Sequence, residues 1–325
     1  MAAISNPQLN PVFEAFKNRN VNRVFFVACG GSSALMYPSK YVLDREAITM
    51  TSDLYSSNEF IHRNPRTLSE ESLVILCSLS GTTPETVEAA KFARSKGALT
   101  IGLTNDPESP LAKASEFVVK FEWGVGKDAF DSNYSNMYQI VFGLLKVKEG
   151  NPKFDAIVNS LSVLQPVFDK ARKQYQLAAE EFATDYKDEK VIYTMASGAS
   201  YGVAYSYAIC ILMEMQWIHS HAIHAGEYFH GPFEIIDKDV PFIILLGLDE
   251  TRPLEERALA FSERYGQRLV VIDAKDFELD GVEEDVKGYI APLVTNHVLR
   301  MYAERLADAR NHPLTERRYM WKVAY

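Results

Sequence analysis

The sequence lacks an excess of positive charge. It contains 34 lysine and arginine residues against 43 aspartate and glutamate residues, which gives a formal net charge of −9 at pH 7. A chain with this balance has no basic field to attract nucleic acid or an anionic membrane surface. An anionic ligand would therefore need local donors such as hydroxyl and backbone N–H groups.

Cysteine and long apolar runs are also scarce. The 3 cysteines, Cys29, Cys77 and Cys210, each lie in an apolar stretch. This setting argues against a disulfide framework, so we expect buried, reduced thiols and a cytoplasmic protein. Residues 1–10 lack the basic start and apolar core of a secretory signal. The most apolar helical stretch, residues 203–218, is too short to span a membrane and contains an acidic residue.

The composition that remains is typical of a globular protein. The chain has 325 residues, of which 47% are hydrophobic and 24% charged, enough for one large or two ordinary domains. Apolar runs that alternate with helical patterns predict an α/β fold with parallel sheets. We expect strands at residues 24–28, 48–54, 73–77, 99–104, 117–121, 191–195, 241–246 and 269–272. We also expect helices at residues 33–43, 84–93, 133–148 and 253–265, and a long helix from residue 203.

The same plan is repeated in the two halves of the chain. Each half begins with a strand, a turn rich in glycine and serine, and a helix, which indicates a degenerate duplication. Helical spacing at residues 154–182 predicts that a helix, not a flexible linker, crosses the boundary. We therefore expect two tandem domains, residues 1–165 and 166–325, each with a doubly wound parallel sheet.

The most informative stretch is Ser-Leu-Ser-Gly-Thr-Thr-Pro-Glu-Thr at residues 78–86, between a predicted buried strand and a predicted helix. Pro84 suits the first turn of that helix, and Thr82 or Thr83 its N-cap. Such a turn directs backbone N–H groups and the positive end of a helix at one point, which predicts a phosphate site without lysine. The hydroxyl donors would be Ser78, Ser80, Thr82 and Thr83. Ordinary loop chemistry is the alternative.

A second turn, Cys-Gly-Gly-Ser-Ser at residues 29–33, follows the first predicted strand. Alone, its two glycines are only a turn signal. Two such turns after two parallel strands would meet at the carboxyl edge of one sheet, where ligands bind in open α/β folds. The second half has no counterpart of the string at residues 78–86, so we expect it to provide catalytic groups and not a second phosphate site.

Two residues of the second half suggest acid–base chemistry. Glu214 lies in the apolar run at residues 208–218, and a carboxylate there is seldom buried without a partner or a function. Burial would raise the pKa of Glu214, which suits proton abstraction beside a carbonyl. An ion pair or a surface position would also explain it. His230 precedes a Gly-Pro turn, and a structural role remains open for it.

The turn at residues 78–86 resembles the phosphosugar-binding signature of the sugar isomerase (SIS) domain superfamily. The turn at residues 29–33 is similar to the turn after the first strand of that family, which makes Ser32 a further ligand. Glu214, with the Gly-Glu-x-x-His-Gly-Pro string at residues 226–232, is similar to the isomerase half of glutamine–fructose-6-phosphate amidotransferase. Across nearly its whole length the chain resembles the fructosamine-6-phosphate deglycases, above all at residues 213–236 and in the tail.

This resemblance implies cleavage of 6-phosphorylated Amadori products to glucose 6-phosphate and a free amine or amino acid. Glu214 would move a proton between C1 and C2, and His230 would assist ring opening, with no metal or redox cofactor. In the related amidotransferase the histidine comes from the neighbouring subunit, so a homodimer with shared sites is expected. Secondary contacts would come from Glu227 and from a cation of the C-terminal tail, namely Arg317, Arg318 or Lys322.

Other functions remain possible from the sequence. An aldose–ketose phosphate isomerase or sugar-phosphate deaminase would use the same proton transfer. A non-catalytic sugar-phosphate sensor is disfavoured, because few residues precede the first strand and leave no room for a helix-turn-helix segment. The chain start likewise leaves no room for a glutamine-hydrolysing domain. The spacing of His219, His221 and His224 is not that of a metal site. We expect Tyr228, Phe229 and Phe233 to pack rather than stack on a sugar.

Overall fold

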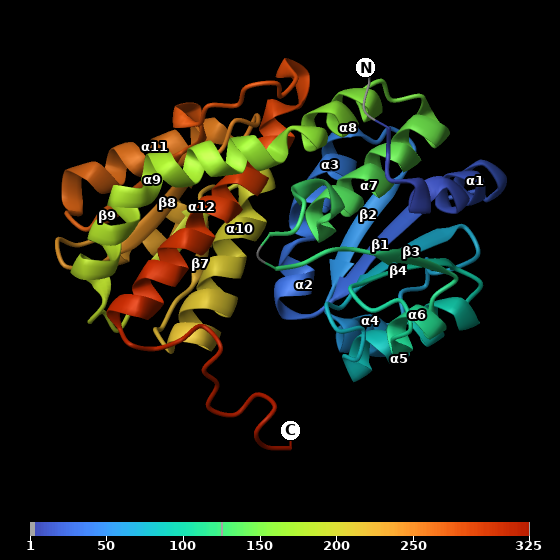
Figure 1. Ribbon diagram of the computed structural model, residues 1–325, viewed down its shortest axis with the longest axis horizontal. Coiled ribbons are helices and arrows are strands. Elements are labelled where there is room, and N and C mark those ends of the chain that lie inside the picture. The colour runs from blue at the N-terminus through green and yellow to red at the C-terminus, as the bar shows by residue number, and fades with distance from the viewer. Residues whose placement is uncertain (1–3, 125, 325) are drawn as a thin grey trace. The chain divides into compact units, whose positions relative to one another are not determined.

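The structure is a computed structural model that describes residues 4–124 and 126–324 (Figure 1). The chain forms two compact units. Unit 1 comprises residues 1–165 and 281–286, and unit 2 comprises residues 166–280 and 287–325. Each unit is described by itself.

Unit 1 contains a five-stranded sheet in the order β2-β1-β3-β4-β5, and all of its neighbouring strands are parallel. The chain starts at β1, adds β2 on one side and then β3 on the other, so the order reverses between β1 and β3. This is a doubly wound sheet, as predicted. The strands are β1 (Arg23–Ala28), β2 (Thr51–Tyr55), β3 (Ser72–Cys77), β4 (Leu99–Thr104) and β5 (Phe117–Lys120).

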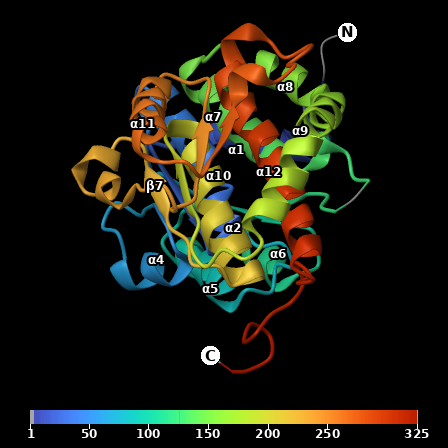
Figure 2. The same ribbon diagram turned by 90° about the vertical axis from the view of Figure 1, so that its left-hand side faces the viewer.

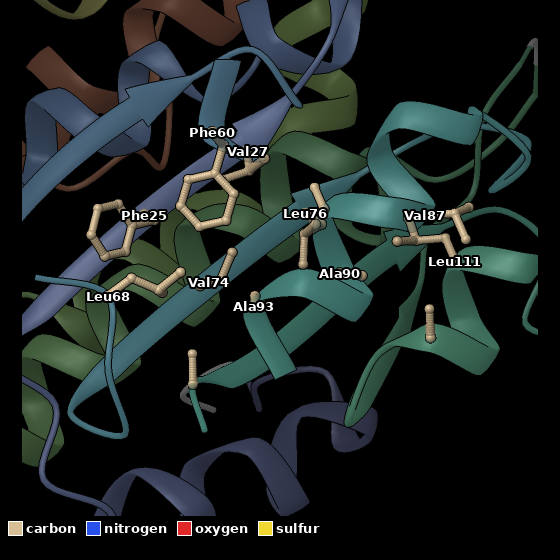
Figure 3. Packing of buried hydrophobic residues seen from close by; sticks show 13 residues of the cluster. Phe25, Val27, Phe60, Leu68, Val74, Leu76, Val87, Ala90, Ala93 and Leu111 are labelled. Carbon is tan, nitrogen blue, oxygen red and sulfur yellow. The ribbon is translucent and has the colours of Figure 1, made fainter. Parts of the chain in front are cut away.

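Helices cover the sheet of unit 1 on both faces because its central strands are apolar on both faces. Every residue of β3 and β4 is buried. Figure 3 shows one face, where Phe25 and Val27 of β1 and Val74 and Leu76 of β3 lie under the helices. Small residues of the covering helix, such as Ala90, let its backbone approach the strands closely.

The helices of unit 1 follow the predicted order with one correction. The sequence predicted one helix at residues 33–43, but the structure has two, separated at Leu35 and Met36, and Pro38 lies in the first turn of the second. The helices are α1 (Asn10–Asn18), α2 (Gly30–Ala34), α3 (Tyr37–Glu46), α4 (Ser57–Arg63), α5 (Pro84–Ser95), α6 (Pro110–Ala114), α7 (Asn133–Glu149) and α8 (Phe154–Ser162).

Unit 2 contains a four-stranded parallel sheet in the order β7-β6-β8-β9. Its strands are β6 (Tyr193–Ala196), β7 (Ala222–His224), β8 (Phe242–Leu246) and β9 (Leu269–Asp273). The sequence predicted all of these except β7, which is only three residues long.

The helices of unit 2 are α9 (Leu164–Tyr186, which begins just before the unit boundary), α10 (Tyr201–Ser206), α11 (Arg252–Tyr265) and α12 (Lys287–Ala309). Residues Tyr207–Met215 continue α10 as a π-helix, η4. The long helix α12 packs beside α10 (Figures 1 and 2). Within residues 4–124 and 126–324, no helix is long and apolar enough to cross a membrane.

Candidate active site

The hydroxyl-rich turn lies between β3 and α5, at the carboxyl edge of the unit 1 sheet, as the sequence predicted. The backbone of the turn is fixed by neighbours, because Leu111 donates its N–H to the Gly81 carbonyl at 2.9 Å and Asn105 donates to the Leu79 carbonyl at 3.0 Å. Thr83 is the N-cap residue of α5 and Pro84 occupies the first turn. The turn is therefore held in shape before any ligand binds.

The four hydroxyls of this turn form two pairs. Ser78 and Thr83 are joined at 2.9 Å between their hydroxyl oxygens, and Ser80 and Thr82 at 2.7 Å. The first pair is partly buried, whereas the second pair is exposed. Among the described residues, no acceptor is found for the N–H groups of Ser80 and Thr83. The turn therefore offers exposed hydroxyls and free N–H donors beside a helix N-terminus, which is the chemistry of an anion site.

The second predicted turn, residues 29–33, leads into α2 and reaches the first one. The hydroxyl of Ser32 makes a hydrogen bond with the thiol of Cys77, the last residue of β3. Burial raises the pKa of Cys77 to about 12, and the bond to Ser32 opposes this only in part. Ser32 is thus brought next to the hydroxyl-rich turn. Cys29 is only partly buried, which corrects the expectation that all three cysteines are buried; all three are free.

Glu214 lies near the C-terminal end of the π-helix η4 in unit 2. The sequence suggested a carboxylate removed from water, but the Glu214 side chain keeps 25% of its exposure. Its Oε1 lies 2.7 Å from Nη2 of Arg317, whose side chain is 8% exposed. The carboxylate is therefore paired and partly buried, not completely removed from water as the sequence suggested.

The three tail cations have different partners. Arg317 faces Glu214, the guanidinium of Arg318 lies 4.3 Å from the ring centre of Trp217, and Lys322 pairs with Glu316 at 3.2 Å. Of the three candidates, Arg317 is the one that reaches the predicted catalytic carboxylate within the described part of the tail.

His230 ends a short 3₁₀-helix, η5 (Tyr228–His230), and is exposed. Gly231 follows with φ of 139°, a conformation that favours glycine. No hydrogen bond, ion pair or ring contact of the His230 imidazole is found among the described residues, and none joins it to Glu214. Glu227 is also exposed, and its charge opposes the burial that lowers the pKa of His224.

The neighbouring aromatic side chains pack, as expected. Tyr228 is fully buried and contacts the rings of Phe229 and Phe233 at centroid distances of 5.1 and 6.5 Å. No group of three or more histidine, cysteine, aspartate or glutamate side chains that could hold a metal ion is found among the described residues.

The comparisons with known proteins agree with these motifs. A family model described as the SIS domain matches residues 19–134 and 185–280. The chain belongs to the SIS-domain family. It is 62% identical over 320 residues to a protein named fructosamine deglycase FrlB from Bacillus subtilis (strain 168), with 98% of each chain covered. It is also 28% identical over 313 residues to fructoselysine 6-phosphate deglycase from Escherichia coli (strain K12), with 96% of this chain and 89% of that protein covered.

A solved structure shows the same SIS fold. The crystal structure of a Bacillus subtilis protein described as a phosphosugar isomerase matches with a TM-score of 0.98 and 62% identity, and the match covers 99% of this chain and 98% of that chain. The resemblance to the SIS superfamily and to its deglycases, inferred from residues 29–33, 78–86 and 213–236, is therefore confirmed.

The second SIS unit does contain a positional counterpart of the hydroxyl-rich turn, which sequence reasoning missed. The strands β7-β6-β8-β9 have the same order as β2-β1-β3-β4, so β8 corresponds to β3 and α11 to α5. Pro253 follows the end of β8 at the same spacing as Pro84 follows the end of β3. On this correspondence, Asp249 stands at the place of Ser80, and Glu255 at the place of Thr86.

These two carboxylates fill the second turn. Asp249 accepts from the N–H groups of Thr251 at 2.8 Å and Ala199 at 3.2 Å. Glu255 accepts from Ser197 N–H at 2.8 Å and Gly247 N–H at 2.6 Å. Burial raises the pKa of Glu255, and these donors lower it; burial is the larger effect, so the pKa is about 7. The donors of the second SIS unit are thus satisfied internally. The equal spacing of proline after two apolar strands is the sequence signal that could have revealed this.

Proposed function

We propose that this chain is a deglycase that cleaves the C1–N bond of 6-phosphofructosyl amino acids and releases glucose 6-phosphate and the amino acid. The observation that carries the proposal is the exposed hydroxyl pair of Ser80 and Thr82 at the N-terminus of α5, a site for a phosphate without a cation. The 62% identity to a fructosamine deglycase over 98% of both chains supports the same reaction.

The hydroxyl-rich turn holds the phosphate of the substrate. Ser80 and Thr82 donate from the exposed side, and free N–H groups add further donors. Ser78, Thr83 and Ser32 complete the site from the partly buried side. Fixing the phosphate restricts the open-chain sugar, so that C1 and C2 are presented to the acid–base groups with less loss of entropy during reaction.

Glu214 carries the proton transfers at carbon. It removes a proton from C1 of the open-chain substrate, and the C2 carbonyl becomes the hydroxyl of an enaminol. It then returns a proton to C2, which gives a Schiff base between C1 and the amino acid nitrogen. Water adds to C1, and the C–N bond breaks with release of the amine. Every step is a proton transfer or a hydrolysis, so no electrons leave the substrate.

His230 assists ring opening and moves protons at oxygen and nitrogen. Its exposed imidazole, without a contact to Glu214 among the described residues of the chain, is consistent with delivery from a second copy of the chain. We therefore propose a homodimer with shared active sites. The free state of Cys29, Cys77 and Cys210 supports a cytoplasmic location.

The test compares substrates. The protein is incubated with fructose 6-phosphate and with 6-phosphofructosyl derivatives of α-linked and ε-linked amino acids. Release of glucose 6-phosphate together with the free amine from the fructosyl derivatives is expected. Conversion of fructose 6-phosphate without cleavage of the derivatives would overturn the proposal in favour of an isomerase. The panel also identifies the preferred amino acid.

A further inference from the structure

The ion pair between Glu214 and Arg317 joins the π-helix η4 to the C-terminal tail. Nη2 of Arg317 lies 2.7 Å from Oε1 of Glu214. No hydrogen-bond donor to Oε2 of Glu214 is found within residues 4–124 and 126–324. One oxygen of the carboxylate is therefore engaged by the tail, and the other has no donor of the described chain.

The guanidinium of Arg317 is held from its own side of the pair. Its Nη1 donates to the carbonyls of Leu314 and Glu316, both at 2.8 Å. The ring centre of Trp321 lies 5.5 Å from the guanidinium carbon. Arg317 is 7% exposed, and its Nε is buried with no partner among the described residues. A buried guanidinium with an unsatisfied N–H is costly, so Glu214 is the charge that balances it.

The tail itself is attached immediately beyond η4. Gln216 donates from Nε2 to the His312 carbonyl at 2.8 Å, and the rings of Trp217 and His312 meet edge to face at 4.4 Å. Trp217 has φ of 54°, which is unusual for a bulky residue. The tail therefore contacts three residues at this end of η4, namely Glu214, Gln216 and Trp217. These contacts hold the end of the helix that carries the carboxylate.

Other charged groups lie near the end of η4 that carries Glu214. Nη2 of Arg310 donates to the Gln216 carbonyl at 3.2 Å, and the guanidinium of Arg318 lies over the ring of Trp217. On its own helix, the buried thiol of Cys210 has a pKa raised by burial first and by the Glu214 charge second. From the tail, Arg317 makes the direct contact, and Glu316 contributes its carbonyl and pairs its side chain with Lys322. Arg317 is therefore the positive group that directly faces the carboxylate among the described residues.

We propose that Arg317 is a positioning residue for catalysis, which holds Oε1 of Glu214 and directs Oε2 toward the substrate carbon. The inference rests on the proposed role of Glu214. It makes the folded tail part of the proton-transfer machinery, because a misplaced tail would leave the carboxylate free to rotate. It also gives the carboxylate a counter-charge at a fixed position.

The test uses Arg317→Met and Arg317→Lys, with Arg300→Met as control. Arg300 pairs with Glu304 at 3.2 Å on α12, so its replacement removes another arginine–glutamate pair. We expect Arg317→Met to lower kcat by about 10- to 100-fold with little change in KM, the signature of an interaction used in the transition state. Arg317→Lys restores part of kcat, and Arg300→Met behaves as wild type.

An unchanged kcat in Arg317→Met would overturn the proposal, and so would a rise in kcat, which would show that Arg317 blocks the site instead. A double-mutant cycle of Arg317→Met with Glu214→Gln, followed by thermal unfolding, tests the pair without activity. If the two substitutions change the thermal stability additively, the proposal would also be overturned. If Glu214→Gln is inactive but Arg317→Met has normal activity, only the positioning role of Arg317 is overturned. If the wild-type protein cleaves no fructosyl derivative, the proposed function itself is overturned.

Discussion

A Cβ atom on Gly81 would lie 2.0 Å from the hydroxyl oxygen of Ser109 and 2.8 Å from that of Thr104. Gly81 is also in the left-handed region, with φ of 66°. The hydroxyl-rich turn therefore needs glycine at this position for two reasons, its backbone conformation and the absence of space for a side chain.

The first prediction separates these two reasons. Gly81→Ala should lower the free energy of unfolding by about 2 kcal/mol or more, because backbone strain and a clash with Ser109 add together. Gly150→Ala is the matched control, since Gly150 has φ of 67° and a Cβ there would meet no atom of another described segment within 4 Å. Urea denaturation of both variants measures the difference. Equal losses of stability would show that the Ser109 contact has no energetic weight.

The second prediction concerns the phosphate. Ser80→Ala and Thr82→Ala should each raise KM for the phosphorylated substrate by about 10- to 100-fold, because a hydrogen bond to a charged group contributes about 1.5–3 kcal/mol. Ser95→Ala, which removes an exposed hydroxyl from the far end of α5, is the control and should leave KM unchanged. If the unphosphorylated sugar loses as much affinity as the phosphorylated one, these hydroxyls do not bind the phosphate.

The third prediction concerns Glu214. Glu214→Gln keeps the size of the side chain but removes the base, so kcat should fall by about 10²- to 10⁴-fold while substrate binding is kept. Isothermal titration with substrate and steady-state assays measure the two quantities separately. Near-normal turnover would remove Glu214 from the proton-transfer role.

The fourth prediction tests the shared site. Glu214→Gln and His230→Asn should each be inactive alone. If His230 acts on the partner chain, unfolding and refolding the two variants together should restore about a quarter of wild-type activity, because half of the dimers are mixed and each has one complete site. Absence of restored activity in verified mixed dimers would place both residues in the same chain's site.

The fifth prediction concerns pH and the buried Glu255. Its pKa in the folded protein is raised from 4.5 to about 7 by burial. The folded state therefore binds more protons than the unfolded state between these values, so stability present below about pH 4.5 is lost as pH rises to about 7. Glu255→Gln should remove this loss. Unfolding free energies measured at several pH values check this prediction, with Glu14→Gln, at an exposed position, as the control. If stability depends on pH in the same way in the wild type and in Glu255→Gln, the prediction is contradicted.

Much of the fold and the position of the hydroxyl-rich turn could be predicted from local patterns. The run at residues 73–77 is apolar throughout and bounded by hydroxyl residues, so the strand and its turn followed directly. The prediction of a single helix at residues 33–43 was wrong. The apolar spacing continues through Leu35 and Met36, where the structure has a break between α2 and α3. The strand β7 was missed because its three residues, the last of which is His224, carry too little periodicity to be recognised.

The tertiary features could not be predicted in the same way. Pairing of Glu214 with Arg317 depends on how the tail folds back, which no local spacing encodes. The π-helical form of residues 207–215 has the same apolar composition as an ordinary helix. Asp249 and Glu255 can be recognised as counterparts of Ser80 and Thr86 only once β8 is matched with β3 by its place in the sheet.

In the second SIS unit, the carboxylates of Asp249 and Glu255 already accept the N–H donors of the turn. The equivalent turn of the first SIS unit carries hydroxyl pairs, and its one acidic residue, Glu85, lies in the first turn of α5. Under the proposed function, the free N–H groups of this turn find an acceptor when a sugar phosphate binds. Ligand binding should therefore tighten the first unit's turn and leave that of the second as it was. Under the proposed function, one half of the duplicated scaffold binds the ligand, whereas the donors of the other half are already occupied by its own carboxylates.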